Sequence, residues 1–311
     1  MNADTAPLSE LELIREFRKR LPSPEKPDLG IGDDCAIIRP TADAPEDWVI
    51  TTDAVTHDIH FDQMATPEQI GHKAVARAIS DIAAMGASPR WCWLNLVCPE
   101  STDTDVALAM MESASNTARS HGAMILGGDT STGPSLSIHV FGMGTVPTGT
   151  SVLRSGAGDG DAIYVTGKLG GSIKGHHLTF TPRVAEGTWL RENGATAMID
   201  LSDGLFTDIR HIMAESGCGA TLHTRQIPVS EAAHQMHGDP IAHACQDGED
   251  YELLVTAPSN MSEQIESDWQ AQFNSPLFRI GTISTSHTSL QLQNDSGAIA
   301  TVETHAYEHF N

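Results

Sequence analysis

Basic residues are scarce in this sequence. Its 311 residues include 18 lysines and arginines against 41 aspartates and glutamates, which gives a formal net charge of −23. A surface of that charge repels the phosphate backbone of nucleic acids and anionic lipid headgroups, so we expect neither as a partner. An anionic ligand would need cations between itself and the protein.

Cysteine pairs and long apolar runs are also missing. The five cysteines form no Cys-x-x-Cys motif and leave one over, which indicates reduced thiols rather than disulfides or a zinc site. No apolar run of about 18 residues is present, which excludes a membrane-spanning helix. The first residues lack the basic and apolar segments of a signal peptide. We therefore expect a soluble, cytoplasmic protein.

The familiar nucleotide-binding motifs are absent as well. The sequence contains no Walker A loop, no HRD or DFG kinase motif and no GxGxxG fingerprint of a Rossmann fold. The spacing of its carboxylates does not match an EF-hand loop, which argues against calcium sensing. Any nucleotide chemistry in this protein must therefore use another architecture.

Helical and strand patterns alternate in both halves of the chain. Residues 66–86 predict a helix capped by Thr66, and Ser9 with Glu12 predicts a capping box for a helix near the N-terminus. A segment rich in Gly, Ser and Thr, residues 147–161, follows a long predicted strand and indicates a domain junction. We predict an α/β protein with mixed α+β sheets and two domains, residues 1–147 and 148–311.

Acidic residues recur in corners rich in Gly or Ser. Taken singly, each corner fits a common structural use, because Asp caps helices and Asp-Gly forms turns. Asp81 is harder to explain in that way, since it lies inside the most apolar predicted helix, where an unpaired charge is costly to bury. The six corners are GIGDDCA (30–36), TTDAV (51–55), SDIAAMGAS (80–88), GGDTS (127–131), IDLSDGL (199–205) and GEDYEL (248–253).

Together these corners indicate a site for metal and phosphate. If several of the carboxylates converge, they raise one another's pKa unless a counter-charge is present, and few basic residues lie near them in the sequence. Carboxylate, hydroxyl and carbonyl oxygens suit Mg²⁺ rather than zinc, and neighbouring glycines let a phosphate approach the backbone. The sequence therefore predicts several Mg²⁺ ions between these acids and a substrate phosphate.

The order of the motifs resembles the thiamine-monophosphate kinase family. That family belongs to the superfamily of aminoimidazole ribonucleotide synthetase and selenophosphate synthetase. The resemblance extends over nearly the whole chain, to the final YEHF. The motifs that carry it are LGIGDDCAII, TTDAVTHDIHF, HKAVARAISDIAAMGASP, LGGDTS, LRSGAGDGDAIYVTG, IDLSDGL and GEDYEL.

The resemblance implies an activity, a fold and an assembly. The activity is ATP- and Mg²⁺-dependent phosphorylation of thiamine monophosphate to thiamine diphosphate, a step in the biosynthesis of that cofactor. The N-terminal domain would bind metal and ATP and pair with a second copy into a barrel, which gives a homodimer. The C-terminal domain would close over the two substrates.

Positions that match the family's motifs receive its roles one by one. The metal ligands would be Asp34, Thr51, Thr52, Asp53, Asp81, Asp129, Asp200 and Asp203. The ATP-binding positions would be Gly128, Asp129, Arg154 and Ser202, and the substrate-binding positions would be His60, Glu249 and Tyr307. Two departures are visible: residues 168–180 form a shorter segment than is usual in the family, and Asp247 stands where Gly is common.

The expected acceptor needs no catalytic base. A phosphate monoester has a second pKa of about 6, so at neutral pH it already carries a nucleophilic oxygen. We therefore expect no acid–base residue, and direct in-line transfer in which Mg²⁺ and Arg154 stabilise charge on the transferring phosphoryl group.

Two alternatives stay open on the sequence. One is another ATP-using synthetase of the same superfamily; selenophosphate synthetase would carry a reactive Cys in an N-terminal Gly-rich loop, whereas Cys35 lies in an apolar run. The other is a non-catalytic Mg²⁺–nucleotide-binding regulatory module, which predicts ATP binding without turnover. The matched acceptor residues His60 and Glu249 argue against such a module.

Overall fold

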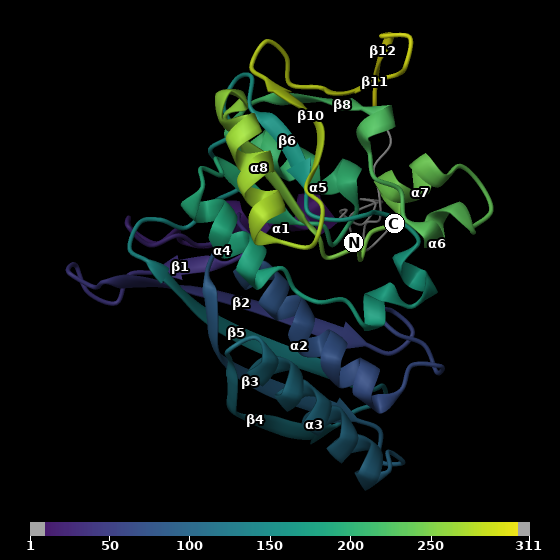
Figure 1. Ribbon diagram of the computed structural model, residues 1–311. Helices are drawn as coiled ribbons and strands as arrows, with labels where there is room; N and C mark the ends of the chain where they lie inside the picture. The colour runs from purple at the N-terminus through teal and green to yellow at the C-terminus, as the bar shows by residue number, and fades with distance from the viewer. Residues whose placement is uncertain (1–9, 304–311) are drawn as a thin grey trace, which may run out of the picture.

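The computed structural model describes residues 10–303. The predicted cap Ser9 and the predicted substrate residue Tyr307 lie outside these residues. Helix α1 (Glu10–Arg20) comes first, and two lobes follow, each built on one β-sheet, as Figure 1 shows. Between residues 10 and 303, no helix is long and apolar enough to span a membrane.

The lower lobe in Figure 1 contains a five-stranded sheet in the order β1-β2-β5-β3-β4. All neighbouring strands are antiparallel except β3 and β4, which are parallel. Strand β2 alternates buried with more exposed residues over much of its length, which is the pattern of a strand with one covered face. The strands are β1 (Ala36–Ile38), β2 (Glu46–Thr56), β3 (Ser88–Cys98), β4 (Met124–Thr132) and β5 (Ser137–Pro147).

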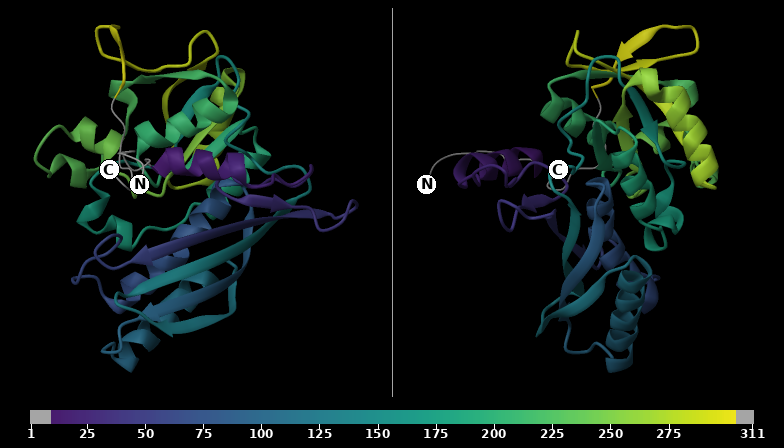
Figure 2. Two further views of the ribbon diagram at one scale, coloured as in Figure 1. Left: turned by 180° about the vertical axis from the view of Figure 1, so that it is seen from behind. Right: turned by 60° about the vertical axis from the view of Figure 1, so that its left-hand side comes forward.

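Helices α2 (Pro67–Ala84) and α3 (Thr104–Ser120) cover one face of this sheet, as the right-hand view of Figure 2 shows. The start of α2 confirms the predicted helix: the Thr66 hydroxyl accepts a hydrogen bond from the Gln69 backbone, and the Gln69 side chain accepts one from the Thr66 backbone. The two helices approach closely at Gly71, where a Cβ would lie 2.0 Å from the Met110 carbonyl oxygen.

The opposite face of the sheet carries exposed apolar side chains. Trp48, Trp91 and Phe141 are 37%, 37% and 44% exposed. On β2, the alternate residues Trp48, Ile50 and Thr52 point to the same face of the sheet. Phe141 on β5 lies opposite Thr52, and Trp91 on β3 lies opposite Met143 of β5, which is itself opposite Ile50, so all three aromatic side chains lie on that face. Large apolar surface of this kind marks an interaction site more often than a free surface.

The upper lobe contains a seven-stranded sheet in the order β12-β11-β8-β10-β6-β9-β7. Both lobes therefore combine helices with mixed sheets, and the predicted α/β fold class is confirmed. The strands are β6 (Ala162–Val165), β7 (Ala197–Asp200), β8 (Gly219–His223), β9 (Leu253–Ala257), β10 (Phe278–Ser284), β11 (Leu290–Gln293) and β12 (Ile299–Thr301). The helices are α4 (Val184–Glu192), α5 (Leu205–Ser216), α6 (Glu231–His234), α7 (Pro240–Gln246) and α8 (Ser262–Gln272), with 3₁₀ turns at η1 (Ser172–Lys174), η2 (His176–Leu178), η3 (Thr224–Gln226) and η4 (Ser259–Met261).

Helix α2 lies between the two lobes. It packs on β2 and β5 of its own sheet and on α4 and β7 of the other lobe. At the second contact a Cβ on Gly187 would lie 2.2 Å from the Ala83 carbonyl oxygen, so α2 and α4 touch backbone to backbone. Side chains on α2 can therefore reach groups from both lobes. The division into domains at residue 147 stays a prediction; β5 ends at Pro147 and β6 begins at Ala162.

Candidate active site

Three ionisable residues form a stripe along α2. Lys73, Arg77 and Asp81 follow one another at intervals of four residues, so they share one face of the helix. That face looks toward the junction of the two lobes, where each of the three side chains meets a charged group from another element. The stripe organises the site.

Carboxylates gather around the C-terminal end of this stripe. Oxygen atoms of Asp34, Asp81 and Asp200 all lie within 4.8 Å of one another. They come from the loop before β1, from α2 and from the end of β7, so both lobes contribute. Ser80 Oγ donates to Asp200 Oδ2 at 2.6 Å, and Thr51 Oγ1 donates to Asp81 Oδ2 at 2.5 Å. We call Asp34, Asp81 and Asp200 the carboxylate cluster.

The cluster resists full ionisation. Burial, and then the charges of Asp34 and Asp53, raise the pKa of Asp200 to about 7. Burial and the neighbouring charges of Asp53 and Asp200 raise the pKa of Asp81 well above its usual value. Beside the cluster, burial and the Asp34 charge raise the pKa of Asp33 to about 7. A divalent cation would remove this repulsion, and the donor set of carboxylate and hydroxyl oxygens suits Mg²⁺.

Two arginines supply counter-charge to the acids. Arg154 Nη2 lies 2.8 Å from Asp34 Oδ1, and the Arg154 backbone N–H donates to both carboxylate oxygens of Asp33 at 3.1 and 3.3 Å. Arg77 Nη2 lies 3.2 Å from Asp53 Oδ1, and its Nη1 donates to the Ala54 carbonyl at 2.9 Å. The adjacent acids Asp33 and Asp34 therefore face a basic residue that is 120 positions away from Asp34 in the sequence.

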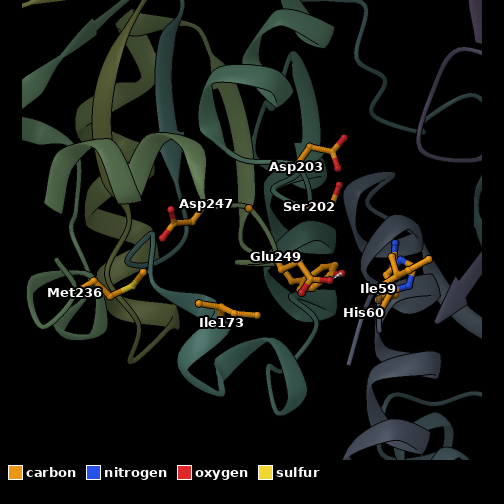
Figure 3. Close-up of a pocket in the computed structure, with 11 residues that line it drawn as sticks. Ile59, His60, Ile173, Ser202, Asp203, Met236, Asp247 and Glu249 are labelled. Atoms are coloured by element: carbon orange, nitrogen blue, oxygen red, sulfur yellow. Dashed lines mark hydrogen bonds between the residues drawn. The ribbon is translucent and has the colours of Figure 1, made fainter. Parts of the chain in front are cut away.

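A cavity of about 320 Å³ opens between the lobes, and Arg77, the partner of Asp53, lies on its wall. Figure 3 shows Ile59 and His60 on one side and Ile173, Met236 and Asp247 on the other, with Glu249 between them. Ser202, Asp203, Arg77 and Tyr251 complete much of the wall. We call this cavity the inter-lobe pocket. Of the residues matched to the substrate by family resemblance, it brings together His60 and Glu249.

Lys73 joins the two sides of the inter-lobe pocket. Its side chain is fully buried, and Nζ donates to both carboxylate oxygens of Glu249 at 2.8 Å and to the His60 carbonyl oxygen at 2.5 Å. Burial lowers the pKa of Lys73 to about 8, and the Glu249 charge opposes that shift. Lys73 was not among the site residues predicted from the sequence. Its position two helical turns before Asp81, within an apolar helix, was the available signal.

Glu249 is held in an unusual backbone conformation. Its φ is +56° and that of Tyr251 is +51°, both in the left-handed region that side chains rarely adopt. The Glu249 backbone N–H donates to the Ser202 carbonyl at 2.7 Å, and that of Tyr251 donates to the Leu201 carbonyl at 2.8 Å. The Tyr251 ring stacks on Phe180 with centroids 3.9 Å apart. Such strain persists only where surrounding contacts fix it.

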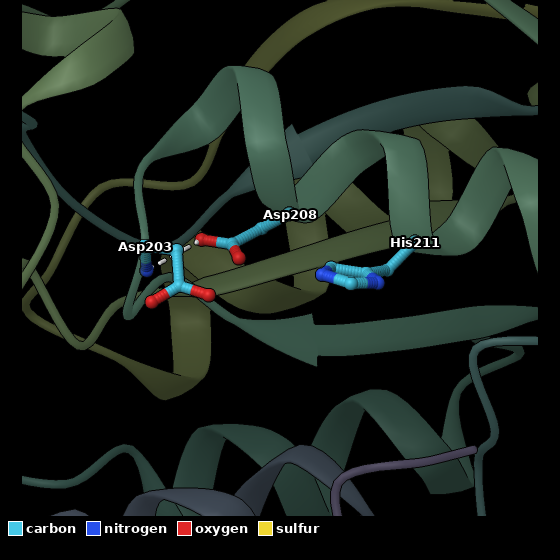
Figure 4. A group of neighbouring side chains, drawn as sticks. All are labelled: Asp203, Asp208 and His211. Carbon is cyan, nitrogen blue, oxygen red and sulfur yellow. Dashed lines mark hydrogen bonds between the residues drawn. The ribbon is translucent and has the colours of Figure 1, made fainter. Parts of the chain in front are cut away.

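A second acidic group lies at the start of α5, shown in Figure 4. Asp208 Oδ2 accepts hydrogen bonds from the backbone N–H groups of Asp203 at 3.2 Å and Gly204 at 3.0 Å, which fixes the turn that carries Ser202 and Asp203. Ligand atoms of Asp203, Asp208 and His211 lie within 4.8 Å of one another. Burial lowers the pKa of His211 to about 3, so its ring is neutral. Asp208 and His211 were not among the site residues predicted from the sequence.

Thr52, Gly128 and Asp129 lie apart from the cluster. Across the sheet, Asp53 on β2 lies opposite Val140 on β5, Val140 lies opposite Leu94 on β3, and Leu94 lies opposite Gly128 on β4. Gly128 is therefore three strands away, or about 14 Å at about 4.8 Å per strand. The register also places Asp129 and Thr52 on the face opposite Asp53, and both are exposed. Within one chain these residues do not join the carboxylate cluster.

Comparisons with known proteins agree with this architecture. The sequence family described as AIR synthase related protein, N-terminal domain, matches residues 32–146. A thiamine-monophosphate kinase of Rhodopirellula baltica is 37% identical over 88% of this chain and 88% of its own. One of Salmonella typhimurium is 35% identical over 97% of this chain and 98% of its own.

A solved structure gives the same result for the fold. The structure described as "AaThiL complexed with AMPPCP and TMP" superimposes with a TM-score of 0.84 at 25% sequence identity, and the match covers 99% of this chain and 100% of that one. The sequence relatives and the shared fold together establish the identity of the protein: this chain belongs to the thiamine-monophosphate kinase family.

Proposed function

We propose that this protein is a kinase that transfers a phosphoryl group from ATP to thiamine monophosphate, with Mg²⁺, to give thiamine diphosphate. One observation carries the proposal: the walls of the inter-lobe pocket hold His60, Glu249 and Arg77. Arg77 pairs with Asp53, whose charge acts on Asp81 and Asp200 of the carboxylate cluster. An acceptor in that pocket can place its phosphate next to metal-bound ATP. The similar structure with AMPPCP and TMP supports both substrates.

The acids of the site fit Mg²⁺. The carboxylate cluster presents several oxygens close together, and burial together with the charges of neighbouring aspartates raises the pKa values of Asp81 and Asp200. We propose Asp34, Thr51, Asp53, Asp81, Asp200 and Asp203 as the metal ligands that one chain brings to this region. When bound, Mg²⁺ would neutralise the phosphates of ATP and polarise the transferring group.

The remaining residues bind and orient the two substrates. Arg154, fixed against Asp34, supplies a charge at the ATP side, and Ser202 lies on the turn that Asp208 holds. His60 and Glu249 bind the acceptor. Lys73 holds both in place, because its Nζ donates hydrogen bonds to the His60 carbonyl oxygen and to the Glu249 carboxylate. The acceptor phosphate needs no base. We also propose direct, in-line transfer without a phosphoenzyme. Tyr307, the third matched substrate position, lies outside the described residues.

A homodimer would complete the site. Gly128 and Asp129 match ATP- and metal-binding positions, yet they lie on the exposed edge strand β4, away from the cluster of their own chain. The same sheet presents an apolar face with Trp48, Trp91 and Phe141 exposed. We propose that two copies pair through this face and that Asp129 and Thr52 complete sites at the interface. A cytoplasmic location stays a prediction.

The direct test is the formation of thiamine diphosphate from thiamine monophosphate, ATP and Mg²⁺. We expect turnover by the wild type and none by Asp53→Asn, with the fold retained. Labelled ATP alone should leave no label on the protein, and a trapped phosphoenzyme would refute direct transfer. ATP binding without any product would favour a regulatory module.

Subunit mixing tests the shared site. Asp53→Asn and Asp129→Asn should each be inactive as homodimers. If Asp129 serves the site of the partner, a mixed dimer regains one intact site, so activity should return on mixing. Absence of recovery in a mixture shown to exchange subunits would refute the shared site.

A synthetase of the same superfamily is the weaker candidate. A selenophosphate synthetase needs a reactive thiol, but Cys35 is 2% exposed, and burial followed by the charges of nearby aspartates raises its thiol pKa well above the usual value. Such a thiol is a poor nucleophile at neutral pH. Turnover with aminoimidazole precursors, but not with thiamine monophosphate, would reverse this ranking.

A further inference from the structure

The two ends of the inter-lobe pocket differ in chemistry. At one end Arg77 and His60 lie beside the metal-binding acids, and Arg77 is paired with Asp53. At the other end Figure 3 shows Asp247 near the apolar side chains of Met236 and Ile173. The phosphate of the acceptor would lie at the first end, beside Arg77 and the proposed metal ligands. The question is what the carboxylate at the second end binds.

Asp247 is fixed at the wall of the pocket. Its Oδ2 accepts a hydrogen bond from the Gly171 backbone N–H at 3.0 Å, and both carboxylate oxygens lie 3.0 Å from His243 Nδ1. Its side chain keeps 22% exposure, although it is held from two sides. The carboxylate is therefore preorganised, and binding a ligand would cost little side-chain entropy.

Asp247 and Glu249 both line the pocket, and each has a basic partner behind it. Both oxygens of Glu249 accept hydrogen bonds from the buried Lys73. His243 is the partner of Asp247, and its Nε2 lies 2.9 Å from the His237 carbonyl oxygen. Because both partners of the ring are acceptors, both ring nitrogens donate, and the hydrogen bond that His243 donates to Asp247 raises the pKa of His243. Asp247 lines the pocket and His243 does not, so the negative member of the pair faces the ligand.

We propose that Asp247 binds the positively charged end of the acceptor, so that the pocket selects a phosphate monoester carried by an organic cation. This inference rests on the proposed function and names the group that would recognise the thiazolium ring. A quaternary ring nitrogen has no N–H to donate, so it is held by charge and by apolar contact rather than by hydrogen bonds. Asp247 supplies the charge, and Met236 and Ile173 supply apolar contact for a flat ring.

Calorimetry with two acceptors tests the proposal. Thiamine monophosphate carries the cation, and the phosphate ester of its 3-deaza analogue, in which a neutral thiophene replaces the thiazolium, keeps the pyrimidine, the flat ring and the phosphate without it. We expect Asp247→Asn to weaken binding of thiamine monophosphate about fivefold, the size of one partly screened charge contact. Binding of the neutral ester should stay the same, because asparagine can still accept from Gly171. Glu231→Gln, which removes an exposed charge in the same lobe, should change neither affinity.

A second variant covers the case in which Asp247→Asn does not fold. Met236→Lys adds a positive charge at the same end of the pocket without touching Gly171 or His243, and it should also weaken binding of the cation selectively. Equal changes for both ligands, or no change in either variant, would refute the role of Asp247. A wild type that binds thiamine monophosphate through Asp247 but forms no product would refute the proposed function and leave this inference standing.

Discussion

Replacing Lys73 by methionine separates the contribution of the inter-lobe ion pair to stability from its contribution to the pocket. The two side chains are similar in length, so the helix and the packing around it should persist. The change removes three hydrogen bonds, two to Glu249 and one to the His60 carbonyl. It also removes the cost of burying an ammonium group, a cost that is evident in the pKa of Lys73, lowered to about 8 by burial.

The size of the effect follows from burial. Breaking a buried ion pair by removing one partner costs about 3–5 kcal/mol. The Glu249 side chain is 27% exposed, so water can hydrate its carboxylate after the change. We therefore expect the free energy of unfolding to fall by about 2 kcal/mol rather than by the full amount. Glu249 would leave its place at the pocket wall, and we expect acceptor affinity to fall about tenfold, or about 1.4 kcal/mol.

The assay combines unfolding with steady-state kinetics. Urea unfolding gives the stability change, and initial rates at varied thiamine monophosphate and varied ATP give the two KM values. We expect the acceptor KM to rise about tenfold and the ATP KM to stay the same, because Arg154 and the carboxylate cluster are untouched. Lys168→Met is the matched control, since Lys168 is exposed. Adding Glu249→Gln should show coupling of about 1–2 kcal/mol with Lys73→Met.

Two results would contradict this reasoning. Additive effects of Lys73→Met and Glu249→Gln on stability would mean that the two side chains do not act as a pair. An equal rise of both KM values would mean that Lys73 supports the fold of the whole site rather than the position of Glu249.

Three further predictions follow from particular contacts. Burial raises the pKa of Asp250 from 3.8 to about 8. Between pH 3.8 and about pH 8 the folded state therefore keeps Asp250 protonated while the unfolded state has lost that proton. The contribution of Asp250 to the free energy of unfolding falls as the pH rises through this range. Asp250→Asn, which can still accept from the Gly170 backbone N–H, should therefore raise the melting temperature at pH 8 and leave it unchanged near pH 3.5; the same gain at both values would refute the assignment. Gly71→Ala places a Cβ against the Met110 carbonyl and should destabilise the protein by about 1–3 kcal/mol in urea unfolding, whereas no loss would show that α3 can shift freely. Phe141→Arg on the exposed apolar face should give folded monomers without kinase activity in light scattering and turnover assays, and a fully active monomer would refute the interface.

Local sequence patterns predicted the main elements because their causes are local. Helix α2 was identified from its cap at Thr66, the proline in its first turn and its apolar periodicity, and all three features are present. The short elements of the upper lobe were missed. Strands β11 and β12 have four and three residues and α6 has four, so their periodicity is too short to be recognised and neighbouring elements stabilise them.

The counter-charges of the site could not be predicted from local sequence. The acidic corners have few basic neighbours along the chain, which led us to expect metal ions as the main source of positive charge, with Arg154 as one fixed charge and no role for Arg77. In the structure Arg154 reaches Asp34 from the start of the upper lobe and Arg77 reaches Asp53 from α2. The metal and arginine roles are compatible, since the pKa values of Asp81 and Asp200 remain raised beside both arginines.

The sequence by itself determined which groups the chain offers: motifs rich in acids and glycines, in an order that identifies the family, and a formal net charge of −23. Tertiary structure alone decided which of these groups meet. Asp34, Asp81 and Asp200 are far apart in the chain and lie together because α2 packs between two sheets. Asp129, in an equally clear motif, lies three strands away from Asp53, because strand order and not sequence order sets distance across a sheet.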